Sequence, residues 1–138
     1  MRIPSAIAVV SIASLLFWAA LNRPLDAPDW EGKFAGVSYN PSGIYNRGEL
    51  ESIPEQRIRE DLDLLRDWTG NVRTYSVDRG LDAVPRIARE VGGLHVSLGI
   101  WLSDDTAYNE AELARAIPLI NEYPDVINRV FVGNEAVL

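Results

Sequence analysis

Residues 94–101, LHVSLGIW, contain the pattern that decides the fold. Every second residue, Val96, Leu98 and Ile100, is a large apolar side chain, whereas the residues between them are polar or small until the aromatic Trp101. Because successive side chains of a strand point to opposite faces of its sheet, one face suits a covering layer of helices. The other face suits a more polar interior. The stretch therefore predicts a strand whose two faces meet different surroundings.

Segments with strand and helix character alternate along the chain around this stretch. The helical segments carry apolar residues at a spacing of three and four, and the strands are short and apolar. The expected strands are residues 34–39, 71–75, 94–101 and 129–133, and the expected helices are residues 52–68, 81–91 and 109–122. This βαβαβαβ order predicts parallel strands covered by helices, which is the α/β class.

Capping residues set the expected helix ends. Ser52 with Glu55, and Asn109 with Glu112, have the spacing of a helix cap and a glutamate at the third helical position. Pro118 lies inside the last expected helix and predicts a kink or an early end.

Two α/β architectures compete at this point, a doubly wound open sheet and a piece of a (β/α)8 TIM barrel. A dinucleotide-binding fingerprint needs three glycines after the first strand, and Gly36 stands alone there. A doubly wound sheet has helices on both faces, which leaves the one-sided polarity unexplained. We therefore expect the N-terminal half of a TIM barrel, with about four βα units.

If the polar face points into the barrel, five side chains meet at the C-terminal ends of the strands. Barrel enzymes build their active sites at this end. These side chains are Tyr39, Arg73, Tyr75, Trp101 and Glu135. A buried arginine or glutamate is costly unless it is paired or used, so Arg73 is interpreted either as a substrate-binding group or as a structural partner of Glu135. His95 begins its strand and is interpreted as a packed core residue. Trp68, at the end of an expected helix, is also interpreted as a core residue.

The sequence Val132-Gly133-Asn134-Glu135 places a carboxylate beside an amide just past a strand. An apolar wall raises the pKa of such a carboxyl group and a hydrogen-bonding neighbour orients it, which suits general acid catalysis on a glycosidic oxygen. Nearby aromatic rings suit the C–H faces of sugars. An Asn-Glu pair alone is also common in surface loops.

Four motifs together resemble glycoside hydrolase family 17, and most of all its bacterial membrane-associated branch of β-glucan synthase-like and glucan-modifying enzymes. They are GVSY at 36–39, VRTY at 72–75, VSLGIW at 96–101 and VFVGNE at 130–135. The resemblance covers about residues 34–135. It implies a (β/α)8 barrel and a retaining glycosidase or transglycosylase acting on β-1,3-linked or related β-glucans.

The resemblance also implies roles for single residues. Glu135 matches the acid/base, and Asn134 matches the residue that touches the sugar 2-hydroxyl. Arg73 and Tyr75 match the second-strand motif that lines the catalytic subsite. Tyr39 and Trp101 are further substrate-binding candidates, carried over from less specific matches.

The second carboxylate is the main departure from the family. A retaining glycosidase needs a nucleophile about 5–5.5 Å from the acid/base, and in this family it lies on the seventh strand. A barrel of about 250 residues is needed to reach it. We therefore expect an N-terminal half that lacks the nucleophile and is inactive alone. The alternatives are a non-catalytic glucan-binding or interaction module beside a membrane glycosyltransferase, and a partner chain that supplies the other strands.

Composition excludes several classes of site. The chain has 13 basic and 20 acidic residues, and the part after residue 23 holds 11 and 20 of these, a net charge of −9. Nucleic-acid binding usually needs a basic surface, so it is not expected. With no cysteine and a single histidine, thiolate and His-pair metal sites are excluded, and no cofactor is expected. Asp104 and Asp105 are interpreted as a loop or helix-capping pair.

Ile3–Leu21 is an uncharged stretch of 19 residues, which spans roughly 28 Å as a helix and matches the hydrocarbon core of a bilayer. We expect a signal-anchor segment over residues 1–23, a stalk over 24–33 and an extracytoplasmic (periplasmic or extracellular) partial barrel over 34–138. The alternative is a signal peptide that is cleaved to give a secreted protein.

Overall fold

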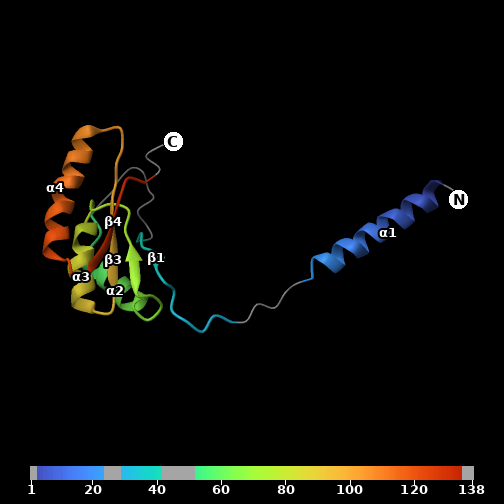
Figure 1. Cartoon of the computed structure of the whole chain (residues 1–138), viewed down its shortest axis with the longest axis horizontal. Coiled ribbons are helices and arrows are strands. Elements are labelled where there is room, and N and C mark those ends of the chain that lie inside the picture. Colours follow the sequence, from blue (N-terminus) through green and yellow to red (C-terminus); the bar gives the residue numbers. More distant parts are fainter. Residues whose placement is uncertain (1–2, 24–28, 42–51, 135–138) are drawn as a thin grey trace. The chain divides into compact units, whose positions relative to one another are not determined.

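The computed structural model of the chain describes residues 3–23, 29–41 and 52–134 (Figure 1). It divides into two units, one up to Glu31 and one from Gly32 onward, and each is described by itself.

The first unit contains α1 (Ile3–Leu21), a helix of 19 residues with a mean hydropathy of 2.0 and no buried residue. It is long and apolar enough to cross a membrane. An uncleaved anchor and a signal sequence both satisfy this criterion, so the two alternatives drawn from the sequence both stand.

The second unit is built on a four-stranded parallel sheet in the order β1-β2-β3-β4. The strands are β1 (Val37–Ser38), β2 (Asn71–Arg73), β3 (His95–Ile100) and β4 (Ile127–Val132). This confirms the predicted parallel α/β sheet, although β1 and β2 are shorter than expected. The consecutive order is what a barrel requires of neighbouring strands.

The connecting helices cover one face of this sheet (Figure 1). They are α2 (Glu55–Leu65), the 3₁₀ helix η1 (Leu81–Ala83) continuing into α3 (Val84–Val91), and α4 (Thr106–Glu122). Leu98 and Val96 of β3 are fully buried in the core between these two layers, together with Ile58, Leu62 and Ile87 of the helices. The predicted helix-facing side of the third strand is thus confirmed.

Two helix starts differ from the predictions. α2 begins at Glu55 with Pro54 at the cap position and no side-chain cap, because Ile53 is buried and its N–H donates to the carbonyl of Arg79 (2.9 Å). The predicted capping box at Ser52 is therefore wrong: tertiary contact ties the preceding residues to another loop.

α4 begins at Thr106, one turn before the predicted cap residue. Asp105 is the N-cap, and its carboxylate accepts the N–H groups of Ala107 (2.9 Å) and Tyr108 (3.2 Å). Asn109 instead exchanges hydrogen bonds with the backbone of Ser103. The predicted capping role of the aspartate pair is confirmed for Asp105, and that of Asn109 is wrong.

α4 continues past Pro118 and ends at Glu122, the predicted last residue of this helix, so of the two alternatives predicted at Pro118 the early end is wrong. Two further expectations also fail. Trp68 is 58% exposed because α2 has already ended at Leu65, and Thr69 occupies the buried position instead. His95 is exposed rather than packed, since it begins β3 on the face that the helices leave open.

Candidate functional site

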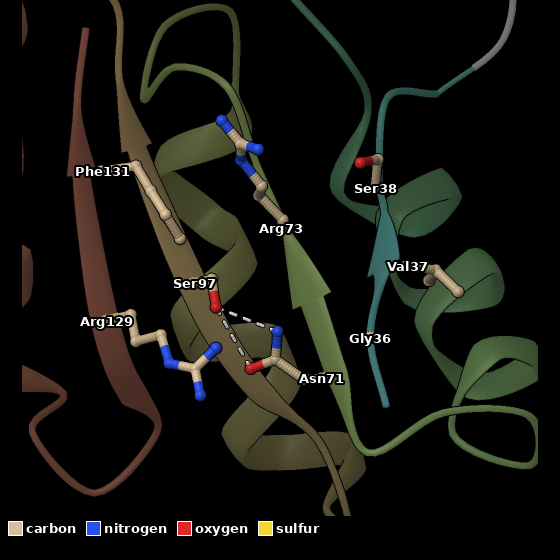
Figure 2. A pocket seen from close by; sticks show the side chains of 8 residues that line it. All are labelled: Gly36, Val37, Ser38, Asn71, Arg73, Ser97, Arg129 and Phe131. Carbon is tan, nitrogen blue, oxygen red and sulfur yellow. Dashed lines mark hydrogen bonds between the residues drawn. The ribbon is translucent and has the colours of Figure 1, made fainter. Parts of the chain in front are cut away.

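The face of the sheet away from the helices contains an open pocket of about 190 Å³ (Figure 2). All four strands contribute to it. Its lining combines two arginines with polar, small and apolar residues, and none of the described residues adds a carboxylate to it; it consists of Gly36, Val37, Ser38, Asn71, Arg73, Ser97, Arg129 and Phe131. This composition agrees with the predicted polar inner face.

Strand register brings these residues together. Ser38 pairs with Arg73, Arg73 with Ser97, and Ser97 with Arg129, so one residue from each strand forms a row across the sheet. Because side chains alternate along a strand, all four point to the same face. The pocket is therefore a direct consequence of parallel register and parity.

Arg73 lies in the upper part of the pocket beside two aromatic rings. Its guanidinium carbon is 4.6 Å from the ring centroid of Phe131 and 5.0 Å from that of Tyr75. Both distances are within the range of cation–π attraction, which contributes about 1 kcal/mol at sites of this kind. Its Nε is buried and has no hydrogen-bond partner among the described residues. The two rings therefore flank the guanidinium group of Arg73.

Tyr75, a predicted substrate-binding residue, is brought next to Arg73 as expected. It follows β2 and its hydroxyl donates to the Oγ of Ser38 (2.9 Å). Phe131 was not predicted as a site residue, although it alternates with Val130 and Val132 along the fourth strand. The same parity argument, applied to every strand, would have found it.

A hydrogen-bonded polar group forms the lower part of the pocket (Figure 2). The Nδ2 of Asn71 donates to the Oγ of Ser97 (2.9 Å), and Ser97 Oγ lies within hydrogen-bond distance of the Oδ1 atoms of Asn71 (3.3 Å) and Asn128 (3.4 Å). Arg129 lies beside Asn71 and Ser97 (Figure 2). Sequence reasoning missed these residues because it concentrated on the ends of the strands, whereas they lie within them.

Tyr39 corrects a prediction. Register pairs Ser38 with Arg73, so Ser38 faces the pocket and Tyr39 faces the helices. Its ring is 5% exposed, and its hydroxyl donates to Asp61 of α2 (3.2 Å). Burial, together with the nearby Asp61 charge, raises the pKa of Tyr39. The predicted face was off by one residue because β1 has only two regular residues from which to judge parity.

Trp101 follows β3 directly and is half-buried, but it does not line the pocket. Its backbone N–H points to the Oε2 of Glu112 on α4 (3.4 Å). Asn134 follows β4 and is also half-buried. Glu135, the predicted acid/base, lies outside the described residues, so its role stays a prediction.

Within residues 3–23, 29–41 and 52–134, no three His, Asp or Glu side chains form a group that is able to hold a metal ion. The acidic residues near the sheet's C-terminal edge have other partners. Asp78 accepts from Arg115 (3.2 Å), and Glu112 accepts from backbone and tyrosine donors.

Comparison with known proteins gives one relative by sequence and two by structure. No family model matches the chain. A glucan endo-1,3-beta-glucosidase of Emericella nidulans is 28% identical over 112 residues, which are 75% of this chain and 17% of the relative. The chain thus spans about a sixth of the length of that curated relative.

The structural matches come from Rhizomucor miehei. They are a glycoside hydrolase family 17 beta-1,3-glucanosyltransferase and an active-site mutant of it in complex with laminaritriose. Each gives a TM-score of 0.59 at 18% identity over 75% of this chain and 37% of the solved chain. At this identity the likeness shows the fold: a parallel α/β sheet that resembles part of a family 17 TIM barrel.

Proposed function

We propose that this chain is the N-terminal part of a retaining glycoside hydrolase or transglycosylase that acts on β-1,3-linked or related β-glucans. The observation that carries the proposal is the guanidinium of Arg73, held between Tyr75 and Phe131 on the open face of the sheet. The names of the relatives support the substrate class, since all of them act on β-1,3-glucan or transfer it.

In the proposed reaction, Glu135 is the general acid and then the general base. It donates its proton to the glycosidic oxygen as that bond breaks, while a carboxylate from the remaining strands attacks the anomeric carbon. Glu135 then deprotonates water, or the hydroxyl of an acceptor sugar, which releases the glycosyl group from the enzyme. Asn134 hydrogen-bonds the 2-hydroxyl of the sugar in the catalytic subsite.

The described residues supply binding and orientation in this scheme. Arg73 donates hydrogen bonds to sugar hydroxyls, and the rings beside it keep its plane fixed. Tyr75 presents a ring and a hydroxyl, which match a sugar's C–H face and polar rim. Trp101 extends the binding surface at the end of β3.

The N-terminal helix adds a location to the proposal. As an uncleaved anchor, α1 holds the catalytic part at the extracytoplasmic face of the membrane, as in the bacterial branch that the sequence resembles. As a cleaved signal, it leads to a secreted enzyme.

The alternative is a non-catalytic glucan-binding module beside a membrane glycosyltransferase. Among the described residues, which do not include Glu135, the pocket lining offers the donors of Arg73 and Arg129, and these suit glucan binding in either case.

The deciding experiment compares Glu135→Gln with the matched surface change Glu110→Gln in the full-length protein. Turnover of laminari-oligosaccharides is expected to fall about 10²- to 10⁴-fold in the first variant, the usual contribution of a general acid, and to stay unchanged in the second. Glucan binding is retained in both. A Glu135→Gln variant with wild-type turnover removes that residue from the mechanism, and a wild-type protein that binds glucan without cleaving it supports the module.

A further inference from the structure

We propose that Glu112 is a positioning residue that joins the two loops at the C-terminal ends of β2 and β3 to α4. Its side chain is completely buried. Its Oε2 accepts the N–H groups of Val77 (3.1 Å), in the loop after β2, and Trp101 (3.4 Å), in the loop after β3. Its Oε1 accepts the hydroxyl of Tyr108 (3.3 Å). One carboxylate therefore bridges three segments of the chain.

The chemistry of this carboxylate indicates a specific role. Burying a charge is costly unless it is hydrogen-bonded, and none of the ion pairs among the described residues involves Glu112. An aliphatic side chain would pack there without that cost but would leave two backbone N–H groups unsatisfied. Glu112 satisfies both N–H groups with a single oxygen, because its side chain is long enough to reach both loops.

Further hydrogen bonds connect the segments at the C-terminal ends of β2 and β3. Arg115, one turn after Glu112 on α4, donates to the carboxylate of Asp78 (3.2 Å), which lies next to Val77. Thr74 at the end of β2 accepts the N–H of Gly99 in β3 (3.0 Å). The loop after β2 is thus attached both to α4 and to the neighbouring strand.

The bridge determines where two proposed sugar-binding residues lie. Trp101 is bonded to Glu112 through its own backbone, and Tyr75 lies two residues before Val77. Releasing Glu112 therefore frees both residues without removing any atom of the pocket. This consequence for glucan rests on the proposed function, whereas the bridge itself does not.

Two variants separate the effect of the length of the Glu112 side chain from the effect of its charge. Glu112→Gln keeps the length of the side chain: its carbonyl oxygen accepts the two backbone N–H groups and its amide donates to Tyr108. Glu112→Asp keeps the charge but is one methylene shorter, so it cannot span both loops. Leu119→Ala is the control, because Leu119 packs against the core from the same helix and has no part in the bridge.

The first test measures amide hydrogen exchange in the full-length protein. Glu112→Asp is expected to speed exchange at Val77 and Trp101 by about tenfold or more beyond any change in Leu119→Ala, while Glu112→Gln stays within about threefold of wild type, since local opening sets the exchange of such amides. Equal exchange at these two amides in the aspartate variant and the control overturns the bridge.

The second test measures hydrolysis or transfer of laminari-oligosaccharides by the same proteins. Glu112→Asp is expected to raise KM about tenfold, the equivalent of about 1.4 kcal/mol of binding free energy, with kcat within about twofold of wild type. Glu112→Gln is expected to keep the wild-type KM. An unchanged KM in the aspartate variant overturns the link to binding. If the wild-type protein has no activity on β-glucans, the proposed function fails, and the exchange experiment still decides the bridge.

Discussion

The two faces of the same four-stranded sheet differ in almost every property. On the helix-covered face, Val72, Val96 and Leu98 are fully buried and form the core. On the open face, the side chains of Arg73, Ser97 and Arg129 line a pocket. The comparison shows that neighbouring residues of one strand have different surroundings: one set packs into the core, and the other lines an open pocket.

The largest expected effect is on the helix-covered face. Leu98→Ala removes a fully buried side chain and is expected to lower the free energy of unfolding by about 3 kcal/mol, as large-to-small changes in cores do. Its neighbour Ser97→Ala loses only polar contacts on the open face and is expected to cost about 1 kcal/mol or less. Chemical denaturation measures both, and equal losses would contradict this difference between the faces.

Gly99→Ala tests the close contact between β3 and the backbone of the residues that follow β2. An added Cβ would lie 2.3 Å from the carbonyl oxygen of Thr74 and 2.6 Å from the Cα of Tyr75, both backbone atoms that cannot rotate away. We expect a loss of about 2 kcal/mol in unfolding free energy, since overpacking forces the backbone to shift. Gly70→Ala is the matched control, because its Cβ would meet nothing within 4 Å. A neutral Gly99→Ala variant would show that Tyr75 is not held in this position.

Arg73→Lys tests binding on the open face. Lysine lacks the planar fork that stacks between Tyr75 and Phe131, so the proposed function predicts about tenfold weaker binding of laminaritriose with a change in unfolding free energy below about 1 kcal/mol. Calorimetric titration measures the affinity. Arg57→Lys on the exposed surface of α2 is the control. A large loss of stability in place of a loss of affinity would make Arg73 a structural residue.

The smallest expected effect is a pH dependence of the free energy of unfolding that arises from Tyr108 on α4. Burial, and then the charge of Glu112, raise the pKa of Tyr108 to about 12. The folded pKa lies above the unfolded value of about 10, so this contribution to stability is complete below pH 10 and is lost as pH rises toward about 12. The wild type should therefore lose stability more steeply over this window than Tyr108→Phe. Denaturation at a series of pH values measures this. Tyr39 also has a raised pKa, but it is present in both proteins and so does not contribute to the difference between their curves. Parallel curves would therefore contradict the role given to Tyr108.

The strand pattern was predictable to a useful degree. The alternation in residues 94–101 predicted both the helix-facing side of β3 and the polar side that carries the pocket. The same alternation applied to residues 71–75 placed Arg73 and Tyr75 on one face. The prediction failed for Tyr39, because a strand of two regular residues does not reveal its parity until its partner strand sets the register.

Helix ends were less predictable, for a similar reason. The spacing Ser52 to Glu55 suits a capping box, yet the backbone N–H of Ile53 bonds to Arg79, and this long-range contact moves the start of α2. Local sequence patterns describe what a segment prefers alone, and a tertiary hydrogen bond or a buried side chain overrides a preference of about 1 kcal/mol.

The sequence by itself determined the class of this protein: parallel strands alternating with helices, one apolar face per strand, and an apolar helix at the N-terminus. These features depend on the period of side chains along a strand or helix, which is a local property. Only the tertiary structure decided that Ser97 and Asn71 share a pocket with Arg129, and that Glu112 joins the loops carrying Val77 and Trp101. Those contacts link residues far apart in the chain, and their geometry exists only once register and packing have brought the strands and helices together.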